Sequence, residues 1–143
     1  MLYFLLLTDI ELSYEGYSED FDIGCFYCRD EAERVAEYYK KNVKGFCDFP
    51  CTYRIIEKKI IGNKIDTLPE EVWTVQGWNE NDYFDEIDIV ESQCFLTEEQ
   101  ANAELQIMKE LYQRKEWSIC YYRIGKKGWK DGFIRMIGGE PVN

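Results

Sequence analysis

Apolar residues recur along the chain at spacings that predict two helices. In residues 29–43 they lie three or four positions apart, as on the buried side of a helix: Ala32, Val35, Ala36, Tyr39 and Val43. Gly45 follows, as expected of a helix C-terminal cap. A second helix is predicted after Thr97 from the stripe Ala101, Leu105, Met108 and Tyr112. Thr97 and Gln100 form a capping box, in which the Gln100 side chain should reach back to the Thr97 amide.

Runs of apolar and β-branched residues predict strands around these helices. The expected strands are residues 2–8, 21–27 and 51–60 in the first half, and 71–77, 87–96 and 117–125 in the second. Each half therefore has the order strand, strand, helix, strand. The apolar run of residues 2–7 is too short to span a bilayer and has no basic segment before it, which favours a buried strand over a membrane anchor.

The two halves also resemble each other residue by residue. A shift of 69 positions, without gaps, gives 9 identities in the 35 positions from residue 25 to residue 59. The matched pairs include Cys25 with Cys94, Cys51 with Cys120, and residues 53–55 with 122–124. This similarity predicts an internal duplication, with a first ββαβ repeat in residues 1–62, a linker in residues 63–70 and a second ββαβ repeat in residues 71–143.

Neither repeat has enough apolar residues to build a large core by itself. The whole chain is 45% hydrophobic, which is sufficient for one substantial core. We therefore expect one compact α+β domain, in which the two repeats form a pseudo-twofold antiparallel sheet with both helices on one face.

The second repeat ends in the motif Trp129-Lys130-Asp131-Gly132-Phe133. Together with the order of its elements, this motif resembles a group of short, uncharacterised bacterial domains that end in Trp-x-x-Gly-aromatic. The resemblance covers each half of the chain separately. The first half departs from it, because Ile60-Ile61-Gly62 stands where the motif would be. The resemblance implies the fold of each repeat and a bacterial or phage origin, and it implies no activity.

The composition limits the chemistry that the chain can perform. Its 143 residues include 28 Asp or Glu, 17 Lys or Arg and no His, so the formal net charge is −11. Without His, the Ser-His-Asp and Cys-His nucleophiles and the His-ligated zinc enzymes are excluded. The acidic balance disfavours nucleic acid and anionic membranes as partners. A cytoplasmic location is the default expectation, and there the six Cys residues should be free thiols.

Two segments account for the whole charge imbalance. Residues 8–22 and 79–91 each contain six Asp or Glu and no Lys or Arg, whereas the rest of the chain has 16 acidic and 17 basic residues. Each segment joins the first strand of its repeat to the second, so each should form a hairpin loop. Both contain aromatic residues, which serve as anchors in protein interfaces. The predicted partner-binding residues are Glu11, Tyr14, Glu15, Tyr17, Glu19, Asp20, Trp78, Glu80, Asp82, Tyr83, Phe84, Asp85 and Glu86.

These features favour a non-enzymatic acidic binding protein. An immunity or inhibitor protein would fit, because two acidic loops can steer a basic protein partner toward their aromatic residues. Loops that only keep the protein soluble are the main alternative, and assembly into a homo-oligomer also stays open. No cofactor is expected. How the two repeats dock decides whether the two loops share one face.

The cysteines support a second hypothesis. Four of them are spaced like the ligands of a structural or regulatory zinc site: Cys25, Cys28, Cys47 and Cys51. The predicted helix between the two pairs is about 20 Å long, which would hold them apart. Cys28 also occupies the predicted N-cap of that helix, where the helix dipole favours a reactive thiolate, although the acidic residues beside it oppose one.

Two further kinds of chemistry receive little support from the sequence. Paired carboxylates serve glycosidases, but among 28 acidic residues some pair always lies close, so the signal is unspecific. Residues 79–91 are rich in calcium-type ligands, yet they lack the central Gly and the alternating ligand positions of an EF-hand loop. We therefore assign no catalytic residue.

Overall fold

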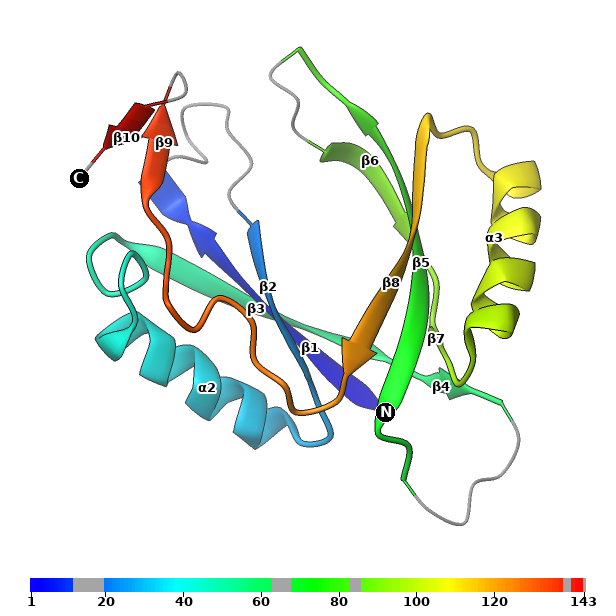
Figure 1. Cartoon of the computed structure of the whole chain (residues 1–143), viewed down its shortest axis with the longest axis horizontal. Helices are drawn as coiled ribbons and strands as arrows, with labels where there is room; N and C mark the ends of the chain where they lie inside the picture. The colour runs from blue at the N-terminus through cyan, green and yellow to red at the C-terminus, as the bar shows by residue number, and fades with distance from the viewer. Residues whose placement is uncertain (12–19, 63–67, 83–85, 138–139, 143) are drawn as a thin grey trace.

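The computed structural model describes residues 1–11, 20–62, 68–82, 86–137 and 140–142. They form an α+β fold made of two units, each with one sheet and one helix (Figure 1). The α+β class expected from the sequence is thereby confirmed. Neither α2 nor α3, the helices of the described residues, is long and apolar enough to cross a membrane.

The first unit is built around β1 (Leu2–Asp9). On one side β1 pairs antiparallel with β2 (Asp20–Phe26), and on the other with β3 (Cys51–Lys58). Helix α2 (Arg29–Asn42) covers one face of this sheet. Every second residue of a strand points to the same face, so Leu5 and Leu7 face the helix and pack with Ala32, Ala36 and Tyr39.

The second unit is built around β5 (Glu71–Glu80), which pairs antiparallel with β8 (Glu116–Arg123) on one side. On its other side lie β6 (Glu86–Glu91) and β7 (Cys94–Phe95), again antiparallel. Helix α3 (Glu98–Leu111) covers one face, where Ala101 and Met108 pack against Val75. The capping box forms only in part: Thr97 accepts from the Gln100 amide, while the Gln100 side chain accepts from the Leu96 amide instead of the Thr97 amide.

From the sequence we expected the two units to share one sheet with both helices on one face. This expectation is wrong. The β1 and β5 sheets are separate, and each central strand is paired on both sides by strands of its own unit. Figure 1 shows the sheets turned toward each other, with α2 and α3 on the outer sides. They meet at one end through an apolar core of Leu2, Phe4, Cys25, Val72 and Cys94, and they diverge at the other.

The units exchange their C-terminal ends. After β3, the short strand β4 (Ile60–Ile61) crosses to the second unit and pairs in parallel with β7. After β8, the chain returns to the first unit, where the amides of Gly125 and Gly128 bind carbonyls of β2 at 2.8 and 2.7 Å. Phe133 then fills the core of the first unit, with its ring stacked on that of Phe21 at 4.4 Å. Each unit is therefore completed by the other half of the chain.

The returning segment is fixed by a buried ion pair. Arg135, at the start of β9 (Arg135–Ile137), binds both carboxylate oxygens of Asp9 at 2.7 Å. Asp9 is fully buried, and the Arg135 guanidinium lies over the Phe49 ring at 3.6 Å. A final strand, β10 (Glu140–Val142), pairs with β9. Two charge-assisted bonds of this length tie the end of the chain to the end of β1.

The Trp-x-x-Gly-aromatic motif therefore closes the first unit, although it belongs to the second half of the sequence. Gly132 has a φ of +80°, and a Cβ there would lie 2.0 Å from the Lys44 carbonyl oxygen, so only glycine fits. The next residue, Phe133, donates its amide to that same carbonyl at 3.1 Å. The glycine thus brings the chain close enough for Phe133 to enter the core.

The two halves match better in their helices than in their last strands. The helices begin 69 residues apart, at Arg29 and Glu98, which is the offset of the sequence match. The strands β3 and β8 begin at Cys51 and Glu116, only 65 residues apart. The identities matched in residues 51–58 therefore occupy different ladder positions in the two sheets. The common order of elements is compatible with a duplication, which stays a prediction.

Candidate functional site

A cleft of about 480 Å³ separates the helix-free faces of the two sheets where they diverge. Its volume lies within the range of about 300–1,000 Å³ that is typical of ligand sites. Its apolar lining comes from Phe4, Leu6, Ile56 and Ile89. Its polar lining comes from both sheets: Asp20, Asp22, Arg54, Lys58, Gln76, Glu86, Glu91 and Tyr122.

Strand alternation explains which residues line the cleft. Leu5 and Leu7 face α2, so Phe4 and Leu6 face the cleft. Strand alternation alone does not explain the wall formed by β6, because Glu86 and Glu91 are an odd number of residues apart and would face opposite sides of a regular strand. A bulge at Asp88, which has a φ of +54°, shifts the register and brings both carboxylates to the cleft wall.

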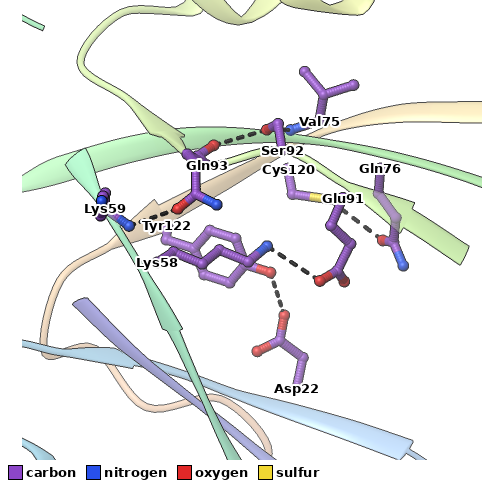
Figure 2. A network of polar contacts seen from close by, with 10 residues as sticks. All are labelled: Asp22, Lys58, Lys59, Val75, Gln76, Glu91, Ser92, Gln93, Cys120 and Tyr122. Atoms are coloured by element: carbon purple, nitrogen blue, oxygen red, sulfur yellow. Dashed lines mark hydrogen bonds and ion pairs between the residues drawn. The ribbon is translucent and has the colours of Figure 1, made fainter. Parts of the chain in front are cut away.

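The inner part of the cleft is held by a polar network that joins the two sheets (Figure 2). The ammonium of Lys58 lies 3.3 Å from the Glu91 carboxylate and 5.1 Å from the centre of the Phe4 ring. The Tyr122 hydroxyl, from the second unit, donates a hydrogen bond to Asp22 of the first. Because the cleft walls displace water, the pKa of the Asp22 carboxyl is raised. Burial beside that carboxylate also raises the pKa of Tyr122.

A second set of bonds closes the narrow end of the cleft. The Lys59 amide donates to the Gln93 side chain at 2.7 Å, and the Cys94 amide donates to the Lys59 carbonyl at 2.9 Å. The Ser92 hydroxyl accepts from the Val75 amide at 2.7 Å and donates to the Gln93 carbonyl (Figure 2). These bonds fix the link between β6 and β7 against the end of β3, and the mouth of the cleft lies where the two sheets diverge (Figure 1).

The mouth carries excess negative charge. Asp20 pairs with Arg54 at 3.2 Å, whereas Glu86 and Glu80, which face each other on β6 and β5, have no ion-pair partner among the described residues. Displacement of water raises the pKa of Glu86, and so do the nearby carboxylates of Glu80, Asp20 and Glu91. Because Asp20 belongs to the opposite sheet, the described ends of both acidic segments lie at one mouth.

The structure places about half of the predicted partner-binding residues. Tyr14, Glu15, Tyr17, Glu19, Tyr83, Phe84 and Asp85 lie outside the described residues. Asp20 and Glu86 line the cleft, and Glu80 lies opposite Glu86. Asp82 is exposed, and the Trp78 indole nitrogen is buried without a hydrogen-bond partner. Both segments join antiparallel strands, as predicted for hairpins.

Part of the charge in the acidic segments is neutralised, which the sequence did not indicate. Asp9 and Glu11 both bind Arg135, so Glu11 is tied to the returning end of the chain. Asp20 and Glu91 bind Arg54 and Lys58 of β3, as described above. The predicted set therefore missed the cations of the cleft. A signal was present, because Thr52, Arg54 and Lys58 alternate along the strand predicted at 51–60 and mark a polar face there.

The four cysteines of the zinc hypothesis are not brought together. Cys25 belongs to the core between the sheets and Cys51 to the core beneath α2, while Cys28 and Cys47 are exposed near opposite ends of that helix. Within the described ranges, which include all four, no group of three or more Cys, Asp or Glu could hold a metal ion. This arrangement therefore gives no support to a zinc site on these four cysteines. Helix packing forces the separation, because α2 is rigid and lies between the two pairs.

The thiols differ in their surroundings. All six cysteines are free. Burial raises the pKa of Cys25 to about 12 and that of Cys51 to about 11, so both remain protonated at neutral pH. Cys28 is the N-cap of α2, as predicted, but its side chain makes no capping hydrogen bond.

Comparison of the chain with protein-family models, curated proteins and solved structures finds no match. The resemblance to short bacterial domains consequently stays a prediction from the motif. The site is interpreted from its own geometry.

Proposed function

We propose that the chain is a non-enzymatic binding protein that holds a basic protein partner at the mouth of the cleft. One observation carries this proposal. The described ends of both acidic hairpins meet at one mouth, where the carboxylates of Glu80 and Glu86 have no cation beside them in the described part of the chain. A positive surface would relieve this repulsion, and the summed field would speed its approach.

The inner cleft supports binding rather than catalysis. Its inner polar side chains are partnered within the chain: Lys58 forms an ion pair with Glu91, and Asp22 accepts a hydrogen bond from the Tyr122 hydroxyl. Such pairs hold the two sheets at a fixed distance, and a preformed surface loses little entropy on binding. An immunity or inhibitor protein that blocks a basic enzyme would use a surface of this kind, so a basic toxin or nuclease is the partner class we propose.

Charge reversal at the mouth tests the function. The double variant Glu80→Lys/Glu86→Lys and the control Glu37→Lys/Glu110→Lys carry the same change of charge, and the control residues are exposed on the two helices. Each variant would be used to capture partners from a host lysate, and the affinity of any captured basic protein would be measured by calorimetry. We expect the mouth variant to lose the partner and the control to keep it. Equal binding by both would refute the proposal.

A further inference from the structure

We propose that the cleft receives one long basic side chain, Lys or Arg, from the partner. The inference rests on the proposed function, since it requires a basic partner, and it adds where and how that partner is recognised. Three features of the cleft support it: the way it holds the cations of this chain, the carboxylates that are left over, and the apolar walls beside them.

The cleft already shows how it binds a basic side chain. Lys58 is almost fully buried, yet its ammonium reaches the Glu91 carboxylate at 3.3 Å and lies over the face of the Phe4 ring. A charged head on a carboxylate and an aliphatic stem along apolar surface is the usual way in which Lys is accommodated. Arg54, which is more exposed, binds the Asp20 carboxylate at 3.2 Å. Each cation is matched to one carboxylate.

The β6 wall holds a further carboxylate that these cations do not match. Glu86 lines the cleft opposite Asp20 and Arg54, and its pKa is raised by water displacement and by the surrounding carboxylates. Arg54 and Lys58 form their ion pairs with Asp20 and Glu91, and within the described residues neither forms one with Glu86. A positive charge from outside the chain would therefore be favoured here over an anion or a neutral group.

Apolar surface lies next to this charge. Ile89, on the same wall as Glu86, is 45% exposed although it lines the cleft, and Leu6 lies on the opposite wall and is only partly covered. An alkyl stem passing between Leu6 and Ile89 would cover both and place its charged head at Glu86. A second copy of this chain is disfavoured as the occupant, because both molecules would bring a net charge of −11.

Peptides that differ only in one side chain can test this inference. The probe is a short alanine-based peptide with a central Lys. One control peptide has ornithine in its place, with the same charge on a shorter stem, and another has norleucine, with the stem and no charge. Binding would be followed by NMR from the methyl groups of Leu6 and Ile89. The exposed methyl groups of Ile107 and Leu111 on α3 would serve as the reference.

We expect the Lys peptide to bind more tightly than both controls and to shift the Leu6 and Ile89 signals but not the reference signals. Glu86→Gln should weaken its binding by about threefold to fivefold, whereas Glu110→Gln on α3 should leave it unchanged. Glu86 is exposed and unpaired in the described structure, so this variant should fold.

The other outcomes separate the inference from the proposed function. If the two charged peptides bind equally and only the amides of Asp20 and Glu86 respond, the cleft does not receive the side chain, while an acidic mouth for a basic partner still stands. If charge reversal of Glu80 and Glu86 also leaves partner capture intact, the proposed function is wrong too. If the Ile89 signal moves with protein concentration alone, the occupant is a second copy, and the inference is overturned.

Discussion

Removal of the Phe133 side chain should destabilise the first unit, although Phe133 lies in the second half of the sequence. Phe133 is 7% exposed and packs against the rings of Phe21, Phe46 and Phe49 at centroid distances of 4.4, 4.9 and 6.2 Å. Truncation of a buried Phe to Ala costs about 3–5 kcal/mol, because apolar burial is lost and a cavity remains. With the loss of the ring pairs included, we expect Phe133→Ala to cost about 4 kcal/mol.

Urea unfolding of the whole chain, followed by tryptophan fluorescence, would measure this loss. A typical domain has a free energy of unfolding of about 5–15 kcal/mol, so the variant should still fold with a much lower midpoint. Ile134→Ala is the matched control, because Ile134 is the next residue and is 49% exposed. That control should change the free energy by less than about 0.5 kcal/mol.

Hydrogen exchange would show where the effect of Phe133→Ala is felt. If the returning segment closes the first unit, amides of α2 and β3 should lose protection in this variant. Two results would refute the reasoning. One is a loss of less than about 1 kcal/mol in the free energy of unfolding. The other is a loss of protection confined to the residues around position 133, because the segment would then pack on a core that is already closed.

The remaining predictions concern an ion pair, a carboxyl group and two thiols. Asp9→Asn should lower the free energy of unfolding by about 3 kcal/mol in urea, because Arg135 would keep its charge and lose its buried partner. Glu86→Gln should raise the free energy of unfolding by up to about 1 kcal/mol at pH 7, because the folded pKa of Glu86 exceeds the unfolded one and its ionised form therefore opposes folding. This gain should vanish below about pH 4, where the carboxyl is protonated in both states. Cys28 and Cys47 should react with a coloured thiol reagent in the folded protein, while the three buried cysteines should react only after unfolding.

Each of these expectations has a contrary outcome. A loss below about 1 kcal/mol for Asp9→Asn would mean that the guanidinium does not depend on this carboxylate. A gain for Glu86→Gln that persists at low pH would assign the effect to packing instead of charge. Fast reaction of every thiol in the folded protein would contradict the burial of Cys25, Cys51 and Cys94.

The helices could be predicted closely because their signals are local. The apolar spacing and the cap residues gave a first helix in residues 29–43, and α2 spans Arg29–Asn42. The second helix begins at Glu98, directly after the predicted cap Thr97. Each of these signals lies within a few residues of the element that it defines, so no knowledge of the packing was needed.

The arrangement of the sheets could not be predicted from the same signals, although β1 held a clue. Residues 2–7 are apolar at every position instead of every second one, which is typical of a strand covered on both faces. One face of β1 packs on α2, and Leu2 and Phe4 on the other face pack against the second sheet. Which element covers that second face depends on contacts between distant parts of the sequence, such as Phe4 with Tyr122.

The candidate site was predicted only in part for the same reason. The two acidic hairpins follow from composition, and Asp20 and Glu86 were identified in this way. Their neighbours were missed, because Arg54 lies 34 residues from Asp20, and Tyr122 lies 100 residues from Asp22. Charge counting treats acidic residues as equally free, whereas the fold decides which of them receive a partner.

The exchange of C-terminal ends sets an order for folding during synthesis. A ribosome delivers the first half long before Phe133 and Arg135, so the aromatic core beneath α2 has to wait, with Phe21 and Phe46 not yet covered by the Phe133 ring, until the returning segment has emerged. A message cut short before codon 133 would therefore yield a product that still contains β4, which completes the second half, but lacks the returning segment, so that the first half stays open. The first half is therefore closed only after the strands of the second half have been synthesised.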